Sequence, residues 1–267
     1  MTKEQERARA RRRQQKLQAR EAERARQAAR NRQVAVVVVA VLAVVALFVF
    51  LSVKLAGDDT NAASSPSASA TSAAASGKCK AAPKTPNSVK KVAKPDKATA
   101  AGKTFEAVIT TNCGTITLEL DGEKAPQTVA SFLALAKAGY WADSPCHRLT
   151  TQGIFVLQCG DPLGGAGPGP GYTFGLENTP KDGSYPKGTL AMARTSDPNS
   201  NSGQFFIVYD DSEIPVSTGG YSIFGTVTTG LDIVEEIAAA GVNGGATDGA
   251  PATPISILKV AVTEKKA

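Results

Sequence analysis

The sequence predicts a mainly β domain over residues 103–267, built as a closed antiparallel barrel whose ends are covered by two helices. Short stretches that alternate apolar and polar residues recur through this region. Only two stretches have helical periodicity, which is too few for a repeated strand–helix–strand unit. The residues before 103 have a different composition and show neither pattern.

Residues 1–33 form a basic tail, with twelve Lys or Arg against four Asp or Glu. The whole chain has a formal net charge of +6, so the remainder is slightly acidic. The high isoelectric point therefore comes from the tail, and no basic domain remains that would bind nucleic acid. We expect the tail to be a solvated helix, or to contact lipid head groups.

Residues 34–53 are an uninterrupted run of twenty residues, all apolar except Ser52. A helix of that length spans roughly 30 Å, the thickness of a bilayer core. A buried core helix is one alternative, and a cleaved signal peptide, with its shorter apolar region and shorter basic start, is the other. We predict a single-pass anchor in the cell membrane, with the basic tail in the cytoplasm and the C-terminal domain outside.

Residues 54–102 are rich in Ala, Ser, Thr, Pro and Lys and have no apolar period. Such a segment cannot bury enough apolar surface to fold alone. We therefore expect a flexible linker that holds the domain away from the membrane.

All four cysteines follow the apolar run, and an even number in an exported domain suggests two disulfides. Cys146 and Cys159 flank a predicted hairpin and could face each other, which would leave Cys79 to join Cys113. This is one of three possible pairings. We expect no metal site, because the chain has one histidine and no Cys-x-x-Cys pair.

The domain begins with two predicted strands, residues 105–111 and 114–120, joined by a turn at 112–114. Pro126 suits the first turn of the helix that follows, and Gly139 suits its end.

Residues 146–161 then form the predicted hairpin, with a polar turn that contains Gly153. Its first arm carries Arg148 among apolar neighbours. A charged side chain in such surroundings costs free energy, so we expect Arg148 to have a binding partner or a function. The glycine-rich stretch 164–171 that follows could cradle phosphate, but no Gly-Lys-Ser/Thr follows and no helix opens there, so we do not expect a nucleotide.

Three further strands are expected at residues 189–194, 204–208 and 221–227. A short helix at 231–237 carries Leu231, Val234 and Ile237 on one face, and Gly241 ends it. The final alternating strand covers 254–262, which completes the barrel.

Five sequence blocks in this order resemble the cyclophilin peptidyl-prolyl isomerases. They are His147-Arg148-Leu149, Phe155-Val156-Leu157-Gln158-Cys159-Gly160-Asp161-Pro162, Leu190-Ala191-Met192-Ala193, Ser202-Gly203-Gln204-Phe205-Phe206-Ile207 and Phe224-Gly225. The resemblance covers roughly residues 103–264. It implies an eight-stranded antiparallel barrel with two helices, and cofactor-free cis–trans isomerisation of X-Pro bonds.

By resemblance, Arg148 is the catalytic hydrogen-bond donor, with Gln158 orienting it or the substrate carbonyl. Phe155, Val156 and Phe206 would line the proline pocket, with Phe155 in the catalytic set. Because neighbours on a strand point to opposite faces, we expect Phe205 in the core and Phe206 in the pocket.

The resemblance also implies a groove for the residues before proline, along Gly167, the run Ala193-Arg194-Thr195, and Gln204. His147 neighbours the catalytic arginine and is counted, with Ile214 and Tyr221, among the expected substrate-binding residues. Isomerisation needs no proton transfer, so a structural or hydrogen-bonding role for His147 is favoured over that of a base.

Two departures from the family concern the rim of the pocket. Ile214 lies in the stretch where many members carry the tryptophan that helps to bind cyclosporin, and Tyr221 replaces a pocket histidine. The resemblance therefore gives no support for cyclosporin binding.

Two functional hypotheses follow. The first is a membrane-tethered isomerase that helps exported proteins to fold, with proline-containing segments as transient partners. The second is a module that only binds proline-containing partners near the membrane. Mere binding would tolerate loss of Arg148, so its presence favours the enzyme.

Overall fold

The computed structural model describes residues 79–266. The basic tail, the apolar run 34–53 and the linker up to residue 78 lie outside the described residues, and the predictions for them stay predictions. Between residues 79 and 266 no helix has both the length and the apolar character needed to cross a bilayer.

The described chain is mainly β, with two α-helices, α2 (Pro126–Lys137) and α3 (Leu231–Ala239). Short 3-10 helices occur at η1 (Lys97–Thr99), η2 (Val216–Thr218) and η3 (Asn243–Gly245). The strands are β1 (Thr104–Thr111), β2 (Gly114–Asp121), β3 (Ser144–Pro145), β4 (Arg148–Gln152), β5 (Ile154–Cys159), β6 (Ser184–Tyr185), β7 (Thr189–Met192), β8 (Phe205–Val208), β9 (Ser212–Glu213), β10 (Ile223–Thr229), β11 (Asp248–Gly249) and β12 (Ser256–Glu264).

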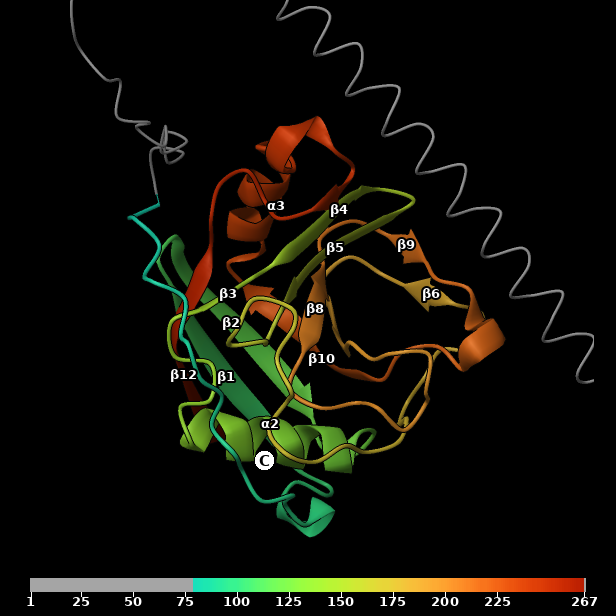
Figure 1. Cartoon of the computed structure of the whole chain (residues 1–267). Helices are drawn as coiled ribbons and strands as arrows, with labels where there is room; N and C mark the ends of the chain where they lie inside the picture. Colours follow the sequence, from blue (N-terminus) through green and yellow to red (C-terminus); the bar gives the residue numbers. More distant parts are fainter. Residues whose placement is uncertain (1–78, 267) are drawn as a thin grey trace, which may run out of the picture. The chain divides into compact units, whose positions relative to one another are not determined.

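Ten strands form one curled antiparallel sheet in the order β11-β4-β5-β8-β7-β10-β2-β1-β12-β3 (Figure 1). The end strands β11 and β3 have two residues each, and the other eight match the number implied by the resemblance. The Cys146 amide donates to the Ile255 carbonyl at 2.9 Å where the chain passes from β3 to β4. No ladder joins β12 to β4 in the described residues. The prediction of a closed barrel is therefore met only in part.

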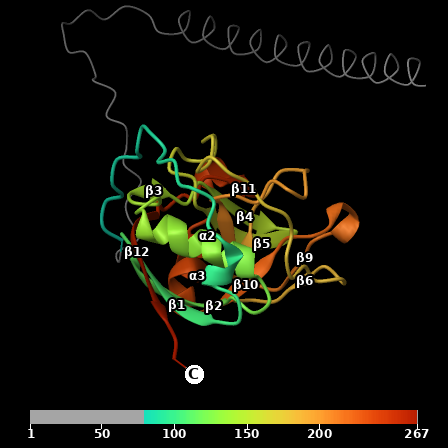
Figure 2. The same cartoon turned by 90° about the horizontal axis from the view of Figure 1, so that it is seen from below.

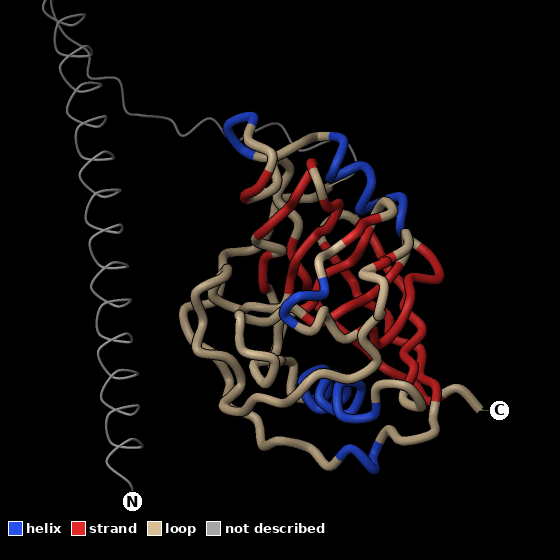
Figure 3. Tube along the Cα trace, turned by 90° about the vertical axis from the view of Figure 1, so that its right-hand side faces the viewer, coloured by secondary structure: helices blue, strands red, loops and turns tan. Residues whose placement is uncertain are grey.

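Helices α2 and α3 lie at opposite ends of the curled sheet (Figures 1 and 2). Pro126 occupies the first turn of α2, and its apolar stripe buries Val129, Phe132 and Leu135. The Phe132 ring reaches into the core, with its centroid 4.6 Å from that of Trp141. Long loops gather on one side of the strands (Figure 3).

Residues 79–103, which we call the strap, differ from the predicted flexible linker because they pack on the domain. The Lys80 amide donates to the Asn112 carbonyl at 2.8 Å, and Ala100 is fully buried in the core. Val89 and Val92 are half-buried against the same core. Apolar periodicity could not reveal this segment, since backbone hydrogen bonds and isolated side chains hold it.

Both disulfides that the sequence analysis considered are present, Cys79–Cys113 and Cys146–Cys159. The first joins the start of the strap to the turn between β1 and β2. The second joins the two ends of the β4–β5 hairpin, whose strands carry the candidate catalytic residues. The described chain has no free cysteine.

Candidate active site

The β4–β5 hairpin places Arg148 and Gln158 opposite each other. Gly153 lies between the strands at φ +78°, a conformation that glycine adopts without steric cost. Arg148 Nη1 donates to Gln158 Oε1 at 3.2 Å. Arg148 and Gln158, two of the three residues predicted to be catalytic, are thus neighbours on one face of the hairpin.

Asp248 holds the other edge of the Arg148 guanidinium. Strand β11 pairs with β4, and the Asp248 carboxylate accepts hydrogen bonds from Arg148 Nε at 2.7 Å and from Nη2 at 2.8 Å. Two such bonds fix the plane of the guanidinium. They lower the pKa of Asp248 and raise the pKa of Arg148. The sequence analysis missed Asp248, because it lies 100 residues after Arg148 in a stretch without a pattern.

A chain of hydrogen bonds continues from Gln158 into the domain. Gln158 Nε2 donates to Gln204 Oε1 at 2.8 Å, and Gln204 Nε2 donates to Asp161 Oδ2 at 3.2 Å. Asp161 is buried and also accepts from the backbone amides of Leu163 and Gly167, at 2.9 and 2.7 Å. A buried carboxylate is tolerated when such donors surround it. The network fixes both glutamine side chains relative to Arg148.

A small cavity of about 90 Å³ lies beside the guanidinium. The rings of Phe206 and Tyr221 meet edge to face, with centroids 5.5 Å apart. Aliphatic side chains complete much of the remaining wall, and the two guanidinium groups of Arg148 and Arg194 also line it. Its lining residues are Arg148, Ile154, Val156, Gln158, Ala193, Arg194, Phe206, Ile214 and Tyr221.

Phe155 does not line this cavity, contrary to the prediction. Successive strand residues point to opposite faces, so Ile154, Val156 and Gln158 share the face of the cavity. Phe155 lies on the other face, where its ring centroid is 6.0 Å from that of Tyr209. Ile154 takes the place that was expected for Phe155. Phe205 and Phe206 follow the predicted alternation, with Phe205 in the core.

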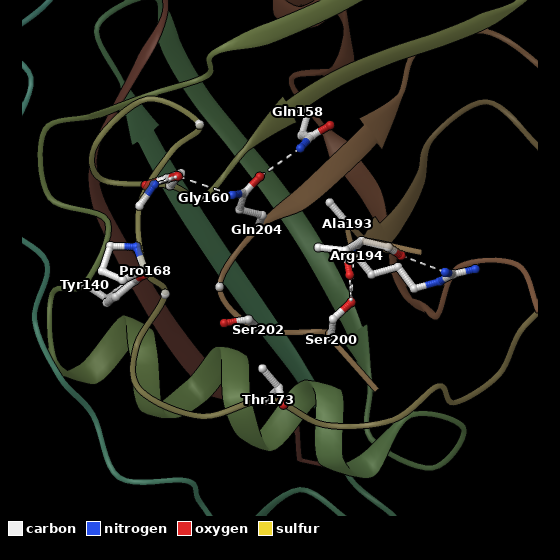
Figure 4. Close-up of a pocket in the computed structure, with 16 residues that line it drawn as sticks. Tyr140, Gln158, Gly160, Pro168, Thr173, Ala193, Arg194, Ser200, Ser202 and Gln204 are labelled. Atoms are coloured by element: carbon white, nitrogen blue, oxygen red, sulfur yellow. Dashed lines mark hydrogen bonds between the residues drawn. The ribbon is translucent and has the colours of Figure 1, made fainter. Parts of the chain in front are cut away.

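A larger cavity of about 400 Å³ adjoins the small one (Figure 4). Gln158, Ala193 and Arg194 line both cavities. The groove residues expected from the resemblance, Gly167, Thr195 and Gln204, also line the larger cavity. Figure 4 shows the hydrogen bond between Gln158 and Gln204 at its edge. The two cavities together provide room for a peptide segment longer than one residue.

Arg194 lies between the two cavities and is held by several contacts. Its Nε donates to the Gly220 carbonyl and its Nη1 to the Thr195 carbonyl, both at 2.8 Å. Its Cζ lies 4.8 Å from the centroid of the Tyr221 ring, a cation–π distance. The side chain thereby positions Tyr221 at the rim of the small cavity.

His147 lines neither cavity. Its Nε2 lies 3.5 Å from Nε2 of Gln158. Burial lowers the pKa of His147, and the nearby Arg148 charge acts in the same direction, while Asp161 opposes both. The imidazole is thus neutral near pH 7 and lies beside Gln158. The structure does not place it in the lining of either cavity, where a substrate-binding residue was expected.

Among residues 79–266, no group of three or more His, Cys, Asp or Glu side chains is arranged to hold a metal ion. The polar side chains around the two cavities are guanidinium, amide and hydroxyl groups and the Asp161 carboxylate, which together can donate to and accept from a peptide backbone.

The curled antiparallel sheet, the two helices and a small cavity beside an arginine define the class of domain: a mainly β fold with a candidate binding groove. The sequence model of the family described as "Cyclophilin type peptidyl-prolyl cis-trans isomerase/CLD" matches residues 107–262, more than half of the chain. The chain belongs to this family.

The chain is similar to "Probable peptidyl-prolyl cis-trans isomerase B" of Mycobacterium tuberculosis, with 44% identity over 194 residues. The match covers 66% of this chain and 62% of that relative. The relative of the same name from Mycobacterium leprae is 44% identical over 191 residues, covering 64% and 63%. The chain thus matches less than two thirds of the length of these curated relatives.

Among solved structures, the chain resembles a cyclophilin type peptidyl-prolyl cis-trans isomerase of Cryptosporidium parvum, with a TM-score of 0.52 and 29% identity. That match covers 61% of this chain and 99% of the other. A structure of the same protein in the presence of the dipeptide Ala-Pro gives a TM-score of 0.51 and 30% identity, covering 59% and 98%.

Proposed function

We propose that residues 103–267 catalyse cis–trans isomerisation of X-Pro bonds in peptides and unfolded proteins. The observation that carries this proposal is the small cavity that is walled in part by aromatic and aliphatic side chains and has the Arg148 guanidinium in its lining. A proline ring is compact and apolar, and the bond to be rotated would lie at the mouth of such a cavity. Family membership supports the same reaction.

The chemical difficulty of the reaction is rotation about a bond with partial double-bond character. The barrier is about 18–20 kcal/mol, and X-Pro bonds exchange over tens of seconds or more without a catalyst. Rotation becomes easier when the lone pair of the proline nitrogen is withdrawn from conjugation with the carbonyl. A donor fixed near that nitrogen stabilises the twisted state more than either planar state.

Arg148 is suited to this task because its orientation is set before substrate arrives. Asp248 occupies Nε and Nη2, and Gln158 accepts from Nη1 on the side of the cavity. One hydrogen then remains on Nη1 and one on Nη2, and the Nη1 hydrogen is the proposed donor for the twisted amide, because Nη1 is the nitrogen hydrogen-bonded to Gln158. A hundred-thousandfold acceleration requires about 7 kcal/mol. One hydrogen bond does not supply all of it, so binding of the twisted peptide in the cavity contributes the rest.

The proposed clients are exported proteins, with the domain held outside the cell membrane by residues 34–53. The apolar run, the basic tail before it and the position of all four cysteines after it support this location. The two disulfides are in keeping with an oxidising compartment.

The test is the rate of cis–trans exchange in a short peptide that contains Ala-Pro-Phe, measured by magnetisation transfer with and without the full chain. We expect exchange faster by orders of magnitude at micromolar protein. A full chain that binds the peptide without accelerating exchange would contradict the enzyme and support the binding module.

A further inference from the structure

The strap lies against the loop that forms one wall of the larger cavity. This glycine-rich loop, residues 164–173, carries Gly167, Gly169 and Thr173 of the cavity lining. Its other side meets the strap, where the Val92 amide donates to the Pro170 carbonyl at 2.9 Å. The strap, drawn in teal in Figures 1 and 2, thus contacts the loop that lines the cavity.

Two lysines of the strap strengthen this contact. Lys91 Nζ donates to the Gly169 carbonyl at 3.4 Å, and Lys94 Nζ donates to the Thr173 carbonyl at 3.2 Å. Both accepting residues line the larger cavity. The three donors of the strap therefore hold three backbone carbonyls within five residues of the loop.

Within the described residues the loop has other attachments near its two ends. The Gly164 amide donates to the Asp161 carbonyl at 3.1 Å, the Ser202 hydroxyl donates to the Tyr172 carbonyl at 3.3 Å, and the Ser131 and Tyr172 hydroxyls lie 2.8 Å apart. The strap supplies the contacts to the part between them.

Glycines have more conformational freedom than other residues, so a loop rich in them needs external contacts to keep one shape. On the inner side, the Gly167 amide donates to Asp161. On the outer side, the strap provides the contacts just described, and its own position is fixed by Cys79–Cys113. The loop is thus held between the catalytic network and the strap.

The strap is also held at the end of α2, so its course does not depend on the loop. Lys90 Nζ donates to the Ala138 and Gly139 carbonyls, at 3.0 and 3.2 Å, where α2 leaves carbonyls unpaired. Further along, Gln127 of α2 donates to the Pro95 carbonyl at 3.1 Å. Contacts on either side of Lys91 and Lys94 therefore fix the strap independently of the loop.

We propose that Lys91, Val92 and Lys94 are positioning residues for the substrate groove: they hold the glycine-rich loop in the shape that accepts the part of a peptide that extends beyond the X-Pro bond. The proposal rests on the proposed isomerase function. It makes residues 79–103 part of the enzyme rather than the end of a passive spacer. Short substrates confined to the small cavity do not depend on the strap, whereas longer ones do.

The test compares the full chain with the double variant K91M/K94M, which keeps the aliphatic stems and removes both donors. K84M/K97M is the matched control. It removes the same charge from two exposed strap lysines whose side chains make no hydrogen bond or ion pair within residues 79–266. The substrates are a blocked Ala-Pro dipeptide and a peptide with four residues before the proline. For the longer peptide we expect KM to rise roughly fivefold in K91M/K94M with kcat unchanged, and no change for the dipeptide.

A second measurement separates this proposal from the proposed function. Hydrogen exchange at the Gly167 amide is expected to be several-fold faster in K91M/K94M and unchanged in the control. Equal KM changes for both peptides, the same changes in the control, or unaltered exchange at Gly167 each overturn the positioning role. Absence of catalysis by the unaltered chain overturns the isomerase assignment instead, and the exchange measurement still decides whether the strap holds the loop.

Discussion

The proposed catalysis depends on Arg148, and Asp248 determines the orientation of its guanidinium group. Three guanidinium nitrogens have recorded partners, Nε and Nη2 with Asp248 and Nη1 with Gln158. The Arg148–Asp248 pair is substantially exposed, so it adds little to stability. Its contribution is orientation, since a long side chain that is already fixed loses less freedom when it meets the twisted amide.

The first prediction concerns Asp248→Asn, which keeps one acceptor and removes the charge. We expect kcat to fall roughly tenfold with KM little changed, because the arginine is less well oriented in the transition state. Asp182→Asn, at an exposed aspartate away from both cavities, is the control. A fall in kcat of the same size in both variants would remove the positioning role from Asp248.

The second prediction concerns pH and His147. Burial lowers the pKa of this side chain below its ordinary value of 6.5, so the unfolded chain binds more protons than the folded one as the pH falls through that value. The contribution of His147 to stability is therefore full above pH 6.5 and declines below it. We expect the midpoint of thermal unfolding to fall from pH 7 to 5.5 and the fall to shrink in His147→Gln. Isomerisation transfers no proton, so kcat should stay level from pH 6.5 to 8.

At the scale of the element, strand alternation decides which aromatic side chain meets the substrate. Val156 and Phe206 line the small cavity, and Phe155 faces the other side of the hairpin. The rule that neighbouring strand residues face opposite sides predicted Phe205 in the core and Phe206 in the cavity, which is where the structure has them. For Phe155 and Val156 the prediction followed the resemblance and put both neighbours in the pocket. The same rule would have put Ile154 there in place of Phe155.

The third prediction compares Phe155→Ala with Phe206→Ala. Phe206→Ala removes a wall of the cavity and should raise KM at least tenfold. Phe155→Ala should leave KM within about twofold and lower the free energy of unfolding by a few kcal/mol, because its ring packs on the core side. Peptide kinetics and denaturant unfolding of both variants provide the check. A large rise in KM for Phe155→Ala would contradict this prediction and show that Phe155 lines the substrate pocket.

The strands and helices were largely predictable, because each has a local signal. Pro126 and Gly139 mark the limits of α2, and the alternation of β1 and β2 follows their buried faces. Asp248 was not predictable, since only the pairing of β11 with β4 brings it to Arg148. The packing of the strap on the domain was not predictable for a related reason. Its partners are carbonyls of distant loops, and such contacts leave no pattern in the sequence of the strap itself.

At the scale of the whole molecule, the described domain follows a basic tail and a long apolar run. The strap begins at Cys79 and is fixed to the domain there. If residues 34–53 span a membrane, 25 residues at most, 54–78, separate the bilayer from a part of the domain that shapes the groove.

The fourth prediction tests that arrangement in cells. The full chain should sediment with membranes and resist extraction by high salt, while deletion of residues 34–53 should release it. Protease added outside intact cells, after removal of any wall, should digest the domain but leave the basic tail. A soluble full chain, or a domain protected from the protease, would contradict the predicted anchor or its orientation.

The most direct test of the central claim is to separate binding from catalysis at Arg148. The measurement is the rate of cis–trans exchange at saturating peptide, together with the Kd for the peptide, in the unaltered chain, Arg148→Lys and Arg148→Ala. Lysine keeps a charge but lacks the planar fork that Asp248 and Gln158 hold. We predict that kcat falls roughly a hundredfold in both variants while the Kd stays within about threefold. A kcat that survives in either variant, or a loss explained by weaker binding alone, would contradict the claim that Arg148 stabilises the twisted amide.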